Sequence, residues 1–148
     1  MKKHSILLVD DEEAIRVSLS FDLRKQGYDV TCSENGERAC ENLEKRSFDL
    51  VITDLVMEGI NGIAVLKKSK ELHPDTRVII ITGHGSLETF REILANGAFD
   101  YLIKPCKREE VALSVGKCME LQALKEQLKQ YELTNDEKHK SMELLVRI

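Results

Sequence analysis

The chain has no tryptophan, and phenylalanine and tyrosine make up only 5% of its 148 residues. This scarcity argues against a surface on which nucleic-acid bases stack on aromatic rings. The net charge is -4 at pH 7, so the chain as a whole has no excess of lysine and arginine with which to neutralise phosphates. We therefore expect no direct contact between this chain and nucleic acid.

Cysteine is also sparse, and long apolar runs are absent. The four cysteines are widely separated and form no C-x-x-C pair, which argues against a disulfide framework or a zinc-thiolate site. The apolar run nearest the start is only four residues long, Ile6–Val9, and is too short for a signal peptide or a membrane span. We expect a reduced cytoplasmic chain with no membrane segment.

Short apolar runs alternate with amphipathic stretches along most of the chain. The predicted strands span residues 6–9, 28–32, 50–53, 78–81 and 101–103. The predicted helices cover residues 13–26, the region of Ala39 and Leu43, a segment ending at Leu72, residues 86–96, and the chain from Arg108 onward. A strand every 20 to 25 residues with a helix between is the spacing of βαβ units, as in an α/β domain with a five-stranded parallel sheet and helices on both faces.

Polar residues follow four of these strands. Asp10 and Asp11 follow the first, Asp54 the third, Thr82 the fourth and Lys104 the fifth. In open parallel sheets, ligands bind outside the carboxyl ends of the strands. We therefore expect these five side chains to converge at one edge of the sheet.

Their chemistry suits phosphoryl transfer. Three carboxylates in one crevice repel one another, and a hard cation such as Mg²⁺, which prefers oxygen ligands, relieves that repulsion. The Lys104 ammonium could hold a phosphate oxygen, and the Thr82 hydroxyl could donate a hydrogen bond to another. An ionised carboxylate can itself act as the nucleophile.

The ordered set Asp10-Asp11-Glu12, Asp54, Thr82 and Lys104-Pro105 resembles the receiver domain of two-component response regulators, over residues 4–120. The resemblance implies a flavodoxin-like, doubly wound (βα)5 fold with strand order 2-1-3-4-5. It also implies that a sensor histidine kinase or phosphotransfer protein phosphorylates the domain, forming a 4-aspartylphosphate.

The resemblance assigns a role to each matching residue. Asp54 is the expected phosphoacceptor, and Asp10, Asp11, Asp54 and the backbone carbonyl of Val56 are the expected Mg²⁺ ligands. Thr82 and Lys104 are expected to contact the phosphoryl group, and Thr82 and Tyr101 to form the switch pair. The Lys104–Pro105 peptide bond is expected to be cis, which X–Pro bonds allow. Apart from the resemblance, His84 is expected to be an exposed loop residue that is neither a phosphohistidine nor a metal ligand.

Two local stretches, Thr53–Met57 and Thr82–Ser86, resemble receivers of nitrogen-regulation-type, sigma-54-dependent activators. This resemblance implies regulation of transcription through a separate output domain. No P-loop motif occurs in the chain, so no ATPase is expected within it. We expect the chain to promote only its own phosphorylation and dephosphorylation.

Residues 121–148 are predicted to form a helical extension. Leu121, Leu124, Leu128 and Tyr131 have the 3-4-3 spacing of a coiled coil, which predicts a homodimer through this helix. The alternative is a solvated helix packed on its own domain. The polar segment 134–141 is predicted to be a loop, and the chain is expected to stop before an output domain.

Other interpretations remain open at this stage. Individually, Asp10 and Asp11 could cap a helix, Asp54 could lie in a turn, and Tyr101 could be a core residue. The chain could be a phosphorylation-independent dimeric module with a vestigial acidic pocket. A phosphatase is less favoured because Val56 stands where such enzymes place an acid. A nucleotide-binding flavodoxin-like protein is less favoured because aspartates follow the first strand and would repel a phosphate.

Overall fold

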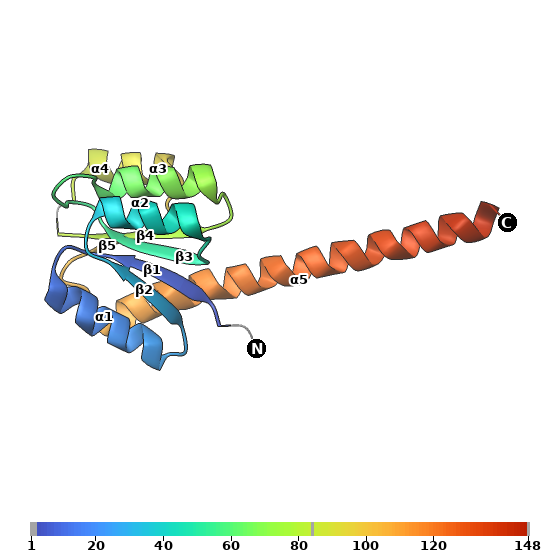
Figure 1. The fold of residues 1–148 in the computed structure, drawn as a ribbon, viewed down its shortest axis with the longest axis horizontal. Coiled ribbons are helices and arrows are strands. Elements are labelled where there is room, and N and C mark those ends of the chain that lie inside the picture. The colour runs from blue at the N-terminus through green and yellow to red at the C-terminus, as the bar shows by residue number, and fades with distance from the viewer. Residues whose placement is uncertain (1–2, 84, 148) are drawn as a thin grey trace.

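The computed structural model describes residues 3–83 and 85–147 and arranges them as alternating strands and helices (Figure 1). The strands are β1 (Ser5–Val9), β2 (Asp29–Ser33), β3 (Leu50–Asp54), β4 (Arg77–Thr82) and β5 (Asp100–Ile103). The helices are α1 (Glu13–Lys25), α2 (Gly36–Lys45), α3 (Gly62–Leu72), α4 (Leu87–Ala95) and α5 (Arg108–Arg147).

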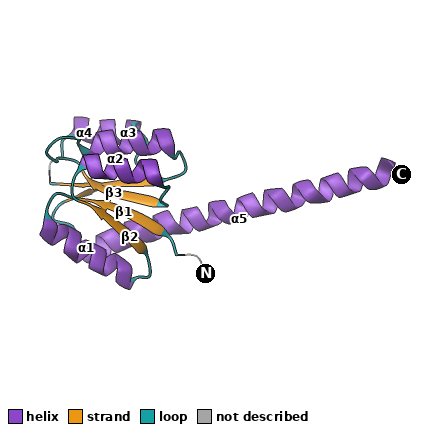
Figure 2. Cartoon of the chain, viewed as in Figure 1, coloured by secondary structure: helices purple, strands orange, loops and turns teal. Residues whose placement is uncertain are grey.

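The five strands form one sheet with the order β2-β1-β3-β4-β5, and every neighbouring pair is parallel. Helices α2, α3 and α4 cover one face, while α1 and the first part of α5 cover the other (Figure 2). The predicted α/β class, the parallel sheet, its strand order and the flavodoxin-like arrangement are confirmed.

The central strands are apolar on both faces because each face lies under helices. In β1, Leu7 packs into the cluster beneath α2, α3 and α4, whereas its neighbour Leu8 packs into the cluster beneath α1 and α5. The same alternation separates Ile80 from Ile79 in β4. Two cores, one on each side of the sheet, therefore fix the strand register and with it the carboxyl edge.

Helix α5 is longer than the sequence predicted. Residues 134–141 were expected to form a loop, but they lie within a single helix that runs from Arg108 to Arg147. The segment contains no glycine or proline, the two residues least compatible with the interior of a helix. Its polarity signals exposure to solvent and not the end of a helix. The helix extends far beyond the sheet (Figure 1).

Ion pairs hold α5 against the domain near its midpoint. The ammonium groups of Lys125 and Lys129 lie 2.5 and 3.3 Å from the carboxylate oxygens of Asp75, in the turn before β4. Among the helices of the described residues, none is long and apolar enough to cross a membrane.

Candidate functional site

The sheet brings together the strand-end residues that the sequence singled out. Asp10 directly follows β1, and Asp54 and Thr82 are the last residues of β3 and β4. Lys104 follows β5, and its backbone N–H donates to the Thr82 carbonyl at 2.8 Å. Thr82 thus ends a strand, whereas the sequence had placed it in the following loop.

Four acidic residues form a cluster at this edge. Asp10, Asp11, Glu12 and Asp54 each offer one carboxylate oxygen, and these oxygens all lie within 4.8 Å of one another. Asp10 and Asp54 are buried, while Asp11 and Glu12 are exposed. Glu12 was not predicted as a ligand. The signal was present, since it is the third acid in a row, but its reach back to the cluster depends on the turn into α1.

Lys104 neutralises part of this charge. Its ammonium donates to Asp54 Oδ2 at 2.9 Å and to Asp10 Oδ2 at 3.1 Å, and lies 3.7 Å from Glu12 Oε1. Burial lowers the pKa of Lys104, but hydrogen bonds to Asp54 and Asp10 and the charges of these carboxylates outweigh it, and the pKa is raised overall. Lys104 therefore stays charged at neutral pH.

The cluster suits a hard divalent cation. Among the described residues, the Lys104 ammonium forms ion pairs with three of the four carboxylates in the cluster, which leaves a surplus of negative charge. Carboxylate oxygens are the ligands that Mg²⁺ takes in proteins. The donor set and its charge therefore fit Mg²⁺.

Hydrogen bonds fix Asp10 in place. Its Oδ1 accepts from the backbone N–H of Glu12 at 2.9 Å, and its carbonyl oxygen accepts from Arg16 Nη1 at 2.7 Å. Burial raises the pKa of Asp10, although the Glu12 N–H and Lys104 partly offset this effect. In the absence of a cation, ionising Asp10 therefore costs the fold free energy.

Replacing Asp10 by asparagine is expected to stabilise the protein at pH 7 without divalent cations, by about 1 kcal/mol. Because the pKa of Asp10 in the folded state lies above its ordinary value of 3.8, its favourable contribution is fully present below that value and is lost as the pH rises through the folded-state pKa. Urea unfolding at pH 7 and below pH 4 measures the effect, which should disappear at the lower pH. Asp11→Asn is the exposed control. A destabilised Asp10→Asn protein at pH 7 would contradict the expectation.

The two predicted switch residues differ in burial. Thr82 is fully buried, and Tyr101 is half-buried, with its ring in a T-shaped contact with the Phe90 ring at a centroid distance of 5.2 Å. The Tyr101 hydroxyl is buried and has no hydrogen-bond partner among the described residues. It lies so close to Gly85 that a Cβ there would overlap the hydroxyl oxygen. Tyr101 therefore packs against the loop that follows Thr82.

The remaining predicted features lie in the loops around the cluster. Val56 is an exposed residue in the loop after β3, 54% accessible to solvent, and the role of its carbonyl stays a prediction. The Lys104–Pro105 peptide bond is cis. His84 lies outside the described residues.

The site opens onto a groove between α1 and the start of α5. The groove has a volume of about 560 Å³ and reaches from Asp10, Asp54 and Lys104 along apolar residues that include Ile15 and Leu19. Beside it, α1 exposes Val17 and Phe21, each by more than 60%. The acidic cluster is therefore accessible from this side, next to an exposed apolar surface.

Comparison with known proteins identifies related sequences over most of the chain. Alginate biosynthesis transcriptional regulatory protein AlgB of Pseudomonas aeruginosa is 35% identical over 131 residues, which cover 88% of this chain and 29% of AlgB. Transcriptional regulatory protein ZraR of Escherichia coli O157:H7 is 40% identical over 114 residues, covering 77% and 26% of the two chains. The chain thus spans less than a third of the length of these relatives.

Solved structures of related proteins superpose on most of the chain. A CheY-like receiver domain protein from Methanospirillum hungatei superposes with a TM-score of 0.81 at 27% identity, over 84% of this chain and 99% of that one. NtrX from Brucella abortus gives a TM-score of 0.79 at 30% identity, over 87% and 29%. This match supports the predicted resemblance to nitrogen-regulation-type receivers. The family model of the response regulator receiver domain matches residues 6–116. The chain therefore belongs to the response regulator receiver family of two-component systems.

Proposed function

We propose that this receiver accepts a phosphoryl group on Asp54 from a sensor histidine kinase or a phosphotransfer protein in a Mg²⁺-dependent reaction. The observation that carries the proposal is the Lys104 ammonium, which bridges the buried carboxylates of Asp54 and Asp10 at the carboxyl edge of the sheet. This arrangement places a nucleophilic carboxylate beside a fixed cation. The exposed apolar residues of α1 next to the groove are suited to docking the donor protein.

The step requires little covalent chemistry from the protein. An Asp54 carboxylate oxygen attacks the donor's phosphorus, the bond from phosphorus to the donor nitrogen breaks, and the donor imidazole keeps that electron pair. Asp10, Asp11, Asp54 and the Val56 carbonyl would hold Mg²⁺, which would supply charge neutralisation at the phosphoryl oxygens. Lys104 and the Thr82 hydroxyl donate to those oxygens. Side chains of this chain thus orient and neutralise the transferred group.

Phosphorylation then changes the surface around α4 and β5. A phosphoryl group on Asp54 adds negative charge and acceptor oxygens, which draw the Thr82 hydroxyl toward them. Tyr101, which packs against the loop after Thr82, follows that loop into a new position. This local change in charge shifts the balance between two arrangements of the loop and Tyr101, and so changes which partners bind.

Intact mass spectrometry after incubation with Mg²⁺ and acetyl phosphate tests this proposal. The protein should gain one phosphoryl group, and Asp54→Ala should gain none. Asp136→Asn, on the exposed part of α5, is the matched control and should be labelled as the unchanged protein is. Label that persists in Asp54→Ala would refute the site. No label at all would favour the phosphorylation-independent module with a vestigial pocket.

We further propose that residues 4–120 form the receiver and that residues 121–148 form a helical extension that pairs with a second copy of the chain. Three apolar residues with coiled-coil spacing on α5, Leu124, Leu128 and Tyr131, are each more than 55% exposed. Leaving such a stripe of apolar surface in water costs free energy, which pairing with a second helix would recover. Two heptads are marginal alone, so contacts between receivers contribute as well.

Replacing Leu124 and Leu128 together by aspartate is expected to weaken dimerisation at least tenfold, because charges would then lie within the paired stripe. Sedimentation equilibrium of the full chain measures the dissociation constant. Gln130→Asp, on the opposite side of the helix, should leave it unchanged. A monomeric unchanged protein, with or without phosphorylation, would instead favour a solvated helix.

The output we propose is regulation of transcription in the cytoplasm through a further domain. The supporting observation is that relatives such as AlgB and ZraR carry transcriptional regulation in their names and are more than three times as long as the matched region. The chain itself is proposed to catalyse nothing beyond its own phosphorylation and dephosphorylation.

A further inference from the structure

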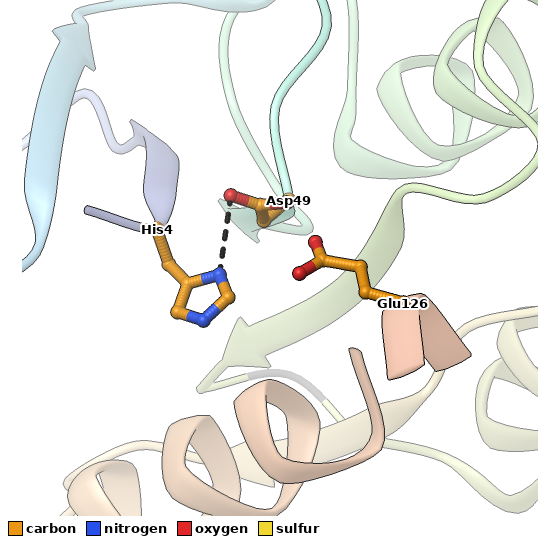
Figure 3. Close-up of side chains that lie close together, drawn as sticks. All are labelled: His4, Asp49 and Glu126. Atoms are coloured by element: carbon orange, nitrogen blue, oxygen red, sulfur yellow. Dashed lines mark ion pairs between the residues drawn. The ribbon is translucent and has the colours of Figure 1, made fainter. Parts of the chain in front are cut away.

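A second group of metal-ligating side chains lies at the opposite end of the sheet from Asp54. His4 directly precedes β1, Asp49 directly precedes β3, and Glu126 lies on α5 (Figure 3). Each offers one ligand atom, and these atoms all lie within 4.8 Å of one another. His4 Nδ1 is 3.5 Å from Asp49 Oδ2. The group therefore lies where the C-terminal helix passes the sheet.

The sheet holds two of these three residues in place. The backbone N–H of Ser5 donates to Asp49 Oδ2 at 2.8 Å, and the N–H of Asp49 donates back to the Ser5 carbonyl at 3.0 Å. The carbonyl of His4 accepts from the N–H of Asp29 at 2.9 Å. The Ser5 N–H thus holds the Asp49 carboxylate directly, and the backbone bonds fix where His4 and Asp49 lie at the start of their strands, before any ligand binds.

Helix α5 is held close to the domain at the turn that carries Glu126. The ion pairs of Lys125 and Lys129 with Asp75 keep this turn of the helix beside the domain. Gln122, one turn before Glu126, is 9% exposed, and its Oε1 atom is buried with no hydrogen-bond partner in the described part of the chain. Gln122 and Asp49 line one surface groove, which is not the groove beside the acidic cluster. The Gln122 side-chain carbonyl oxygen is therefore a buried acceptor in this groove that needs a partner.

The charge of the group also points to a cation. Within the described ranges, neither Asp49 nor Glu126 forms an ion pair with a lysine or arginine, so the two carboxylates face each other and an imidazole. A dication would balance them. In a tetrahedral zinc site the ligand atoms lie about 3.4 Å apart, given metal–ligand distances of about 2.0 to 2.2 Å. The 3.5 Å between His4 Nδ1 and Asp49 Oδ2 matches this ligand-to-ligand distance.

We propose that His4, Asp49 and Glu126 bind Zn²⁺, with the Gln122 carbonyl oxygen or a water molecule in the fourth position. An imidazole beside two carboxylates suits Zn²⁺ better than Mg²⁺, which takes oxygen ligands. The ion would link α5 to the base of the sheet and fix the direction in which the helix leaves the receiver. This site is separate from the acidic cluster and independent of phosphorylation.

Isothermal titration of the untagged full chain with Zn²⁺, in excess Mg²⁺ to occupy the acidic cluster, tests the proposal. We expect one site, and a loss of affinity of at least about tenfold in His4→Phe and in Glu126→Gln. Glu132→Gln, further along α5, is the matched control and should bind as the unchanged protein does. Zn²⁺ should also raise the melting temperature of the unchanged protein but not that of Glu126→Gln.

Cobalt substitution distinguishes this site from binding at the cysteines. Co²⁺ bound to nitrogen and oxygen should give visible absorption bands without the strong near-ultraviolet band of a thiolate complex. A thiolate band, equal affinity in His4→Phe, or no binding of Zn²⁺ would each overturn the proposal.

Discussion

Replacing Lys104 by alanine is expected to slow phosphorylation of Asp54 by acetyl phosphate about a hundredfold, the usual effect of removing one fixed donor that stabilises transition-state charge. The Lys104 ammonium lies 2.9 Å from Asp54 and 3.1 Å from Asp10, so it is the group best placed to meet charge that develops at the phosphoryl oxygens. Without it, the two carboxylates repel each other and the incoming phosphoryl group. Only the positioning of Asp54 relative to the phosphoryl donor would then promote the reaction.

The rate of label gain by intact mass spectrometry, in saturating Mg²⁺, gives the measurement. Lys107→Ala is the matched control, since this lysine is exposed three residues further on and forms no ion pair among the described residues. If Lys104→Ala were labelled as fast as Lys107→Ala, the ion pairs of Lys104 would be structural only, and its proposed role in the transfer would be wrong.

Lys104→Ala is also expected to lower the stability of the protein, by an amount that depends on pH. Because the pKa of Lys104 is raised in the folded state, its stabilising contribution is fully present below its ordinary value of 10.5 and is lost only as the pH rises through the folded-state pKa. The contribution is therefore complete at neutral pH. The loss of stability in Lys104→Ala should accordingly be present at pH 7 and should shrink in acid, where Asp10, whose pKa is raised, becomes protonated.

The sheet and its acidic edge were predictable because their signals are local. β1, β3 and β4 are apolar on both faces, which only strands covered on both sides require, and such strands alternated with amphipathic helices. Once the strands are parallel, residues at their carboxyl ends must meet. Asp10 and Asp54, although 44 residues apart, needed no further information to be brought together.

Other features depend on how distant segments approach, which no local pattern reports. His4 and Glu126 carry no motif, and they become neighbours only because α5 passes the start of β1. The error at residues 134–141 had a different cause. A polar stretch was interpreted as a loop, although polarity reports exposure, and the stretch contains no glycine or proline that would end the helix.

Gly62 shows how closely the backbone packs around the phosphoacceptor. It is the first residue of α3, and its N–H donates to the Leu55 carbonyl at 2.8 Å, which folds the loop after β3 back on the strand end. A Cβ on Gly62 would overlap the carbonyl oxygen of Asp54 and lie 2.9 Å from the Leu55 Cα atom. Both are backbone atoms, so an added side chain would force either the end of β3 at Asp54 or the start of α3 to move.

Gly62→Ala is therefore expected to destabilise the protein by about 3 kcal/mol, at the upper end of the usual cost of overpacking. Gly116→Ala provides a control of opposite sign, because Gly116 lies inside α5 with nothing within 4 Å of the position that an added Cβ would occupy, and the change should add about 1 kcal/mol of helix stability. Urea unfolding of both variants measures the difference. Equal effects would show that the loop relaxes freely around Gly62 and that Asp54 is not held by this contact.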